Sequence, residues 1–211
     1  MKKKVFSLMM TLLLAFVGIA RADELTVNDG TTTNNYVPVH GFYADAYLKC
    51  EFVQPAADLA DMNGATINGM TFYASQSSVD WGSCEFQVFL TEVGNTTLSS
   101  FVGDGTIVYQ GALSIVNGEM NVTFNQPYTY QGGNLLVGFY QLFHDGYSES
   151  YWYGVSATGA SVQGYSYSSL SSISASQRNF LPKTTFDYTP ACGGGEGGED
   201  IVVEIGDGTE T

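Results

Sequence analysis

Residues 84–91 read Cys84-Glu85-Phe86-Gln87-Val88-Phe89-Leu90-Thr91, and this stretch decides the fold class. Apolar and polar side chains alternate over its first half, and a β-strand places alternate side chains on opposite faces. The pattern therefore predicts a strand in which Phe86 and Val88 face a core while Glu85 and Gln87 face water.

Similar short segments lie on both sides of this strand. Residues 46–53 alternate in part and place Leu48, Cys50 and Phe52 on one face. The other predicted strands are residues 66–73, 106–110, 112–116, 120–124, 134–140, 151–155, 162–167 and 184–188. Turn signals such as Asn117-Gly118 separate them. Many short strands with regular turns indicate an all-β domain, an antiparallel sandwich or barrel.

One short helix is predicted near residues 55–62. Pro55 suits the first turn of a helix, and Asn63-Gly64 supplies a stop signal. The helix interrupts the strands only once, so it does not alter the all-β fold class.

The first 22 residues have the three parts of a secretory signal peptide. Lys2-Lys3-Lys4 precedes the apolar residues 5–19, and Ala20-Arg21-Ala22 supplies a small-residue cleavage site. The apolar run is shorter than the roughly 20 residues that span a bilayer. We therefore expect residues 1–22 to be a signal peptide and the protein to be secreted or held at the cell surface, with no membrane span after signal removal.

Charge narrows the classes of partner. The chain has 7 Lys/Arg and 21 Asp/Glu, a formal net charge of −14. Four of the cations and none of the acids lie in residues 1–22, so removal of this segment leaves 3 cations and a net charge of −18. So acidic a surface repels phosphate backbones and anionic lipid headgroups, which argues against nucleic acid as a partner.

The remaining chain divides into three parts. Residues 23–190 form the predicted β-sandwich module, and residues 191–200 form a Gly-rich acidic linker. Residues 203–211, Val203-Glu204-Ile205-Gly206-Asp207-Gly208-Thr209-Glu210-Thr211, repeat the pattern of residues 25–33, Leu25-Thr26-Val27-Asn28-Asp29-Gly30-Thr31-Thr32-Thr33. We therefore interpret residues 201–211 as the start of a truncated second repeat of the same module.

Several stretches together carry a family resemblance. They are Gly30-Thr31-Thr32-Thr33-Asn34-Asn35-Tyr36-Val37-Pro38-Val39, residues 55–59, residues 64–73, residues 126–137 and Leu181-Pro182-Lys183-Thr184-Thr185-Phe186-Asp187-Tyr188. In this order the chain resembles the repeated β-sandwich modules of secreted, multidomain surface and adhesin-type proteins of Bacteroidota. The resemblance implies a jelly-roll-like sandwich in a binding or adhesion context, and it brings no catalytic residues.

Aromatic residues are the candidate ligand-binding groups. Trp81 and the run Tyr151-Trp152-Tyr153 stand beside polar turn residues, and carbohydrate modules stack sugars on such rings. The alternative is that some of these rings fill the core, because strand neighbours point to opposite faces.

Cysteine and acidic residues give two further candidates. Cys50 and Cys84 either form a disulfide, which export permits, or remain buried thiols. Acidic turns at Asp104 and Asp145, with Glu149, could hold Ca²⁺, although no calcium-loop motif is present. We expect no other metal or cofactor.

The sequence has no recognisable catalytic motif, so we expect a protein that is not an enzyme. The expected function is a non-catalytic extracellular binding or adhesion module of a tandem-repeat secreted or surface protein, with a glycan or protein ligand. One alternative is a carbohydrate-binding module that uses exposed Trp and Tyr. Another is an accessory domain of a secreted peptidase or glycosidase whose catalytic part is absent from this sequence.

Overall fold

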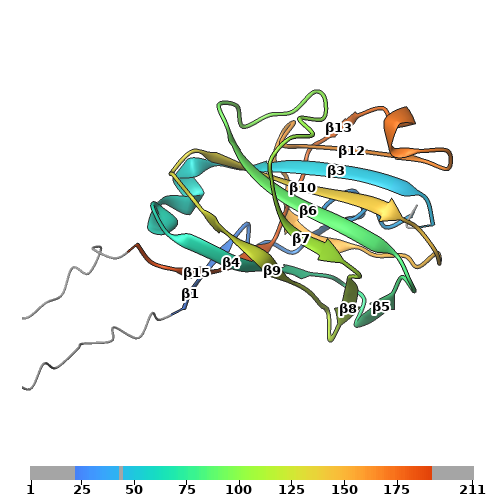
Figure 1. The fold of residues 1–211 in the computed structure, drawn as a ribbon, viewed down its shortest axis with the longest axis horizontal. Helices are drawn as coiled ribbons and strands as arrows, with labels where there is room; N and C mark the ends of the chain where they lie inside the picture. Colours follow the sequence, from blue (N-terminus) through green and yellow to red (C-terminus); the bar gives the residue numbers. More distant parts are fainter. Residues whose placement is uncertain (1–21, 43–44, 192–211) are drawn as a thin grey trace, which may run out of the picture.

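The computed structural model describes residues 22–42 and 45–191 of the chain. These residues form two six-stranded sheets, which face one another, and one three-stranded sheet (Figure 1). Every strand pairing within the sheets is antiparallel. The predicted all-β antiparallel sandwich is therefore confirmed. The predicted signal peptide, most of the linker and the second repeat lie outside the described residues.

The first sheet is named here by its edge strand β1. Its order is β1 (Asp23–Val27), β15 (Thr184–Thr189), β4 (Thr66–Tyr73), β9 (Glu119–Thr129), β8 (Ser114–Val116) and β5 (Ser78–Asp80). The facing sheet runs β13 (Ser176–Arg178), β12 (Ser161–Ser166), β3 (Tyr47–Gln54), β10 (Asn134–Phe143), β6 (Glu85–Val93) and β7 (Thr106–Gly111). The small sheet runs β14 (Leu181–Pro182), β11 (Trp152–Val155) and β2 (Thr32–Asn34).

The helical segments are short. The predicted helix is confirmed in place as a 3₁₀ helix, η1 (Ala56–Met62), which buries Leu59 and Met62. A further 3₁₀ turn, η2 (Leu170–Ser172), carries no buried residue. No helix in the described part of the chain is both long enough and apolar enough to cross a membrane.

The core between the two large sheets is built on aromatic rings. Phe72 of β4 meets Phe52 of β3 and Phe139 of β10 edge-on, with ring centroids 6.1 and 5.4 Å apart. The residues predicted to face the core, which include Phe86 and Val88, are buried in this same cluster. Edge-to-face contacts between buried rings stabilise a core beyond the area they remove from water.

A second apolar cluster covers the outer face of the second large sheet, which we name the β3 sheet after one of its central strands. Its buried members are Val53, Phe89, Leu98, Leu136, Tyr140 and Val162. Leu98 belongs to the loop of residues 94–105, which lies over this face and brings Phe101 against it. The loop is therefore part of the folded domain.

A buried carboxylate fastens this loop to the sheet. Glu51 has no exposed surface, and its two oxygens accept hydrogen bonds from the backbone N–H groups of Val102 (2.7 Å) and Gly103 (3.0 Å) and from the Tyr140 hydroxyl (2.6 Å). The Tyr140 hydroxyl stays protonated, because burial and the Glu51 carboxylate raise its pKa. The bond from the Tyr140 hydroxyl is buried, and the two bonds from Val102 and Gly103 are partly buried.

We predict that Glu51→Ala lowers the free energy of unfolding by about 3 kcal/mol, because it leaves three donors without their acceptor. Tyr140→Phe, which removes one donor, should cost about 1–2 kcal/mol. Urea denaturation measures both changes. The control is Glu85→Ala, which removes a carboxylate bonded to Gln110 at the surface and should change stability by less than about 0.5 kcal/mol. Equal stability of Glu51→Ala and wild type would contradict the proposed role of Glu51.

Candidate functional site

A cavity of about 360 Å³ opens where segments from distant parts of the chain meet. Its polar and aromatic lining side chains include Asp29, Tyr73, Asn117, Glu119, Tyr153 and Lys183. Asp29 follows β1, Tyr73 ends β4, Glu119 begins β9, Tyr153 lies in β11, and Lys183 joins β14 to β15. The cavity is therefore built at the ends of strands from both the β1 sheet and the small sheet.

Backbone contacts bring these strand ends together. The Lys183 N–H donates to the carbonyl of Tyr153 at 2.7 Å, which ties the link between β14 and β15 to β11. The Ala74 N–H donates to the carbonyl of Gly118 at 2.8 Å. Asn117 and Gly118 have φ angles of 55° and 83° and form the turn between β8 and β9. Asn-Gly is favoured at such a turn because both residues need positive φ, so this part of the site follows from a local sequence signal.

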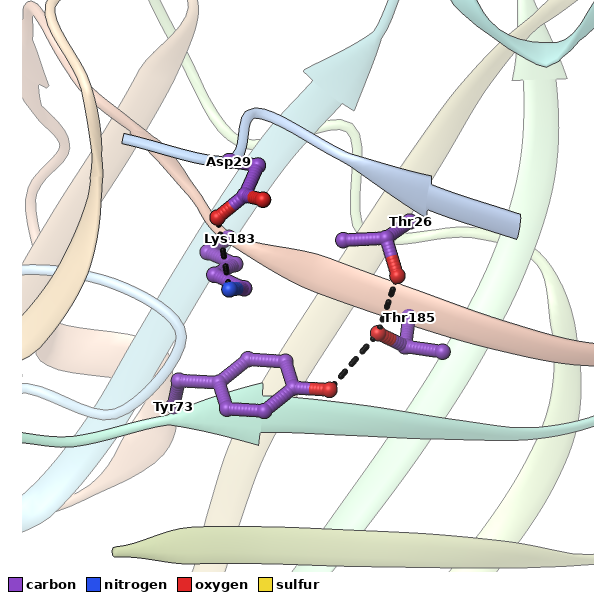
Figure 2. A network of polar contacts seen from close by, with 5 residues as sticks. All are labelled: Thr26, Asp29, Tyr73, Lys183 and Thr185. Atoms are coloured by element: carbon purple, nitrogen blue, oxygen red, sulfur yellow. Dashed lines mark hydrogen bonds and ion pairs between the residues drawn. The ribbon is translucent and has the colours of Figure 1, made fainter. Parts of the chain in front are cut away.

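A polar network fixes the side chains on one wall (Figure 2). The Lys183 ammonium lies 2.6 Å from an oxygen of Asp29 and 4.6 Å from the centre of the Tyr73 ring. The Tyr73 hydroxyl and the Thr185 hydroxyl are 2.8 Å apart, and the Thr185 hydroxyl is 2.7 Å from that of Thr26. The Lys183 ammonium lies over one face of the Tyr73 ring, and Tyr153 supplies the second aromatic ring of the lining.

Of the four aromatic residues predicted to bind a ligand, the two tryptophans are fully buried, and for them the prediction is wrong. Trp81 and Trp152 have no exposed surface, and their rings lie 6.5 Å apart in the core. The Trp81 indole N–H donates to the carbonyl of Ser148 (3.1 Å), and the Trp152 N–H donates to the carbonyl of Val39 (2.8 Å). Because each ring buries its large apolar surface and satisfies its N–H internally, neither can stack on a sugar.

The two tyrosines beside Trp152 point the other way, as strand alternation requires. Tyr153 lines the cavity. Tyr151 lies outside the cavity lining, where its hydroxyl donates to Glu149 at 3.0 Å and its ring meets Phe42 edge-on at 5.8 Å. The structure thus brings Tyr153 together with Tyr73, Asp29, Glu119 and Lys183, a grouping that the sequence analysis missed because these residues are far apart in the chain.

Cys50 and Cys84 are buried thiols and are not joined by a disulfide. The Cys50 thiol donates to the carbonyl of Tyr36 at 3.3 Å. The Cys84 sulfur accepts from the Gln141 side chain at 3.1 Å and from the Asp145 N–H at 3.3 Å. Burial raises the pKa of both thiols. Of the two alternatives for Cys50 and Cys84, a disulfide or buried thiols, the structure shows buried thiols.

Two of the acidic residues considered for Ca²⁺, Asp145 and Glu149, accept hydrogen bonds from neighbouring side chains or backbone. One Asp145 oxygen accepts from the backbone N–H (3.0 Å) and the hydroxyl (2.8 Å) of Ser83, and these bonds lower the pKa of Asp145. Glu149 accepts from Tyr151. Across residues 22–42 and 45–191, no group of three or more His, Cys, Asp and Glu side chains could hold a metal ion.

A second group of aromatic side chains surrounds His40. Its ring lies 5.6 Å from that of Tyr36 and stacks at 6.1 Å on Tyr165, while the Arg178 guanidinium lies 3.9 Å over Tyr36. Burial, with a smaller contribution from the charge of Arg178, lowers the pKa of His40 to about 4. These groups pack on one another and none of them lines the cavity, so we read the cluster as structural.

Comparisons with known proteins did not add an assignment. No protein-family model matches the chain, and neither the curated proteins nor the solved structures gave a significant match.

We predict that the buried thiols react only after unfolding, because the thiolate is the reactive form and burial disfavours it. In a Cys192→Ser variant, iodoacetamide at pH 8 should leave the native protein unmodified, and in denaturant it should alkylate Cys50 and Cys84. Intact-mass spectrometry gives the result directly. A protein that takes up no label in denaturant until a reductant is added would instead contain a Cys50–Cys84 disulfide.

Proposed function

We propose that this protein is a non-catalytic extracellular binding module whose cavity takes a neutral carbohydrate. The observation that carries the proposal is the placement of the half-buried Tyr153 ring in one cavity with Asp29, Asn117 and Glu119. This combination of an aromatic surface and convergent oxygen-rich side chains matches the two kinds of surface that a sugar presents.

The aromatic part of the cavity suits the apolar face of a sugar ring. Tyr rings provide a flat apolar area with a polar tip, and such residues are common where one side of a ligand is apolar and the other is wet. Tyr153 supplies this area, and Tyr73 adds a second ring that Thr185 and Lys183 hold in place.

The polar part suits hydroxyl groups. Carboxylate oxygens only accept hydrogen bonds, an amide both donates and accepts, and an ammonium only donates. Asp29, Asn117 and Lys183 therefore offer sugar hydroxyls both donors and acceptors within one cavity of about 360 Å³. Convergent polar groups beside an aromatic surface are typical of ligand sites.

Charge favours a neutral ligand over an acidic one. Asp29 and Lys183 form an ion pair within the cavity, so the charge of Glu119 remains uncompensated by the other lining residues. The whole chain carries a net charge of −14. An anionic sugar would approach a negative surface and a negative cavity, and both repel it.

The extracellular part of the proposal is supported by the sequence. Residues 1–22 have the pattern of a signal peptide, and the chain resembles repeated modules of secreted surface proteins. A module of this kind that binds neutral glycans would attach its parent protein to a glycan-coated surface, which is a form of adhesion.

We predict that a glycan array detects binding to neutral glycans and that Tyr153→Ala weakens the binding about two- to tenfold, since a ring contact is worth about 0.5–1.5 kcal/mol. Isothermal titration calorimetry with the best array ligand measures the affinity. Glu119→Gln should weaken it less, because the amide keeps one acceptor.

The matched control is Tyr151→Ala, which removes the neighbouring outward-facing ring from outside the cavity and should leave affinity unchanged. Two results would refute the proposal: binding confined to acidic glycans, or affinity that falls in Tyr151→Ala and not in Tyr153→Ala. Circular dichroism melts establish that the variants are folded.

A further inference from the structure

Strand β1 lies at the edge of its sheet and is held by one neighbour. It pairs with β15 from Asp23 opposite Tyr188 to Val27 opposite Thr184, and no strand among residues 22–42 and 45–191 pairs with its other side. An edge position of this kind is a template on which another extended segment can pair.

Four side-chain or backbone features fix β1 and the residues after it in place. Val27 is buried and Leu25 packs against the core. Asn28 adopts a left-handed backbone with a φ of 54°. Asp29 pairs with Lys183 at 2.6 Å (Figure 2). A Cβ at Gly30 would lie only 2.4 Å from the carbonyl oxygen of Gly154, so this position requires glycine.

Residues 201–211 repeat the sequence of β1 and meet each of these requirements. The equivalent pairs are Leu25 and Val203, Val27 and Ile205, Asn28 and Gly206, Asp29 and Asp207, and Gly30 and Gly208. The two inward positions stay apolar. Glycine takes the left-handed position, where it is the residue of lowest cost, and the aspartate and the obligatory glycine are unchanged.

The repeat also differs from β1 at two positions where the β1 side chain makes a hydrogen bond but meets no steric requirement. Glu204 replaces Thr26, so the hydrogen bond between the Thr26 and Thr185 hydroxyls would be absent. Gly206 replaces Asn28, whose side chain donates to Gln54 at 2.6 Å. The repeat thus keeps the residues that the site sterically requires and loses two polar contacts.

The path of the chain places the repeat near this site. β15 ends at Thr189, beside the start of β1, and β1 runs antiparallel to β15. A segment that follows β15 and turns back therefore runs in the direction of β1. In the β1 register Ile201 would pair with Tyr188, and residues 189–200, which are rich in glycine, would form the connection. Closing a glycine-rich connection of about twelve residues costs little entropy.

We propose that the β1 position on β15 is a strand-acceptor site with a second ligand within the same chain, residues 201–209. β1 and this C-terminal segment are then alternative edge strands of one sheet. Exchange between them keeps an aspartate beside Lys183 and an apolar residue in the place of Val27.

Disulfide trapping in the full chain tests this proposal. In a Cys192→Ser background, Thr185→Cys combined with Glu204→Cys places thiols at positions that pair in the proposed register. We expect an intramolecular disulfide under mild oxidation, seen as a mass 2 Da lower in a protein that sediments as a monomer. The reference variant combines Thr185→Cys with Thr26→Cys and traps β1 itself. The matched control combines Thr185→Cys with Glu210→Cys, whose positions do not pair in the proposed register. We expect the control to form much less disulfide.

A variant cycle provides a second measurement. Val27→Asp puts a carboxylate into the core and should release β1, so that residues 201–205 gain protection from amide hydrogen exchange. Ile205→Asp alone should change little, and the double variant should melt about 5–10 °C below Val27→Asp. Three results would each overturn the proposal. The first is a Val27→Asp variant that melts at the same temperature as the double variant. The others are a disulfide yield no greater than in the control pair, and a disulfide that joins two chains.

Discussion

The contact of Phe72 with Phe52 and Phe139 is the interaction on which the rest of the structure depends. It joins the middle of the β1 sheet to the middle of the β3 sheet, with ring centroids 6.1 and 5.4 Å apart. Both sheets must keep these rings inward, and a shift of one residue in register would send them to solvent. The same constraint therefore fixes which side chains every strand presents to the outside.

The cavity follows directly from that constraint. Tyr73 comes next after the buried Phe72 in β4, and Tyr153 comes next after the buried Trp152 in β11, so both tyrosines face away from the core. Their strands end at the same place because the Ala74–Trp152 bridge joins β4 to β11. The outward neighbours of two core rings thereby become the aromatic side chains of one site.

Local sequence patterns predicted the parts of this structure that local forces determine. The alternation in residues 84–91 and 46–53 identified β6 and β3 and the inward faces of both. Strands β2, β5, β13 and β14 have two or three residues each, too few for a pattern, and form because neighbours offer them partners. For Trp81 and Trp152 the sequence left open a ligand surface or the core, because polar turn residues lie near both and their depth depends on packing between distant segments.

The ion pair between Asp29 and Lys183 was beyond sequence analysis for the same reason, since it depends on the pairing of β1 with β15 from opposite ends of the chain. That pairing also makes β1 serve two purposes, because the strand closes the sheet and carries Asp29 to the cavity. A strand at this edge without an aspartate at the position of Asp29 would lack the ion pair with Lys183. The Lys183 ammonium would then be available to a ligand. Residues 201–211 keep the aspartate, so the strand exchange proposed above would leave the charge of the cavity unchanged.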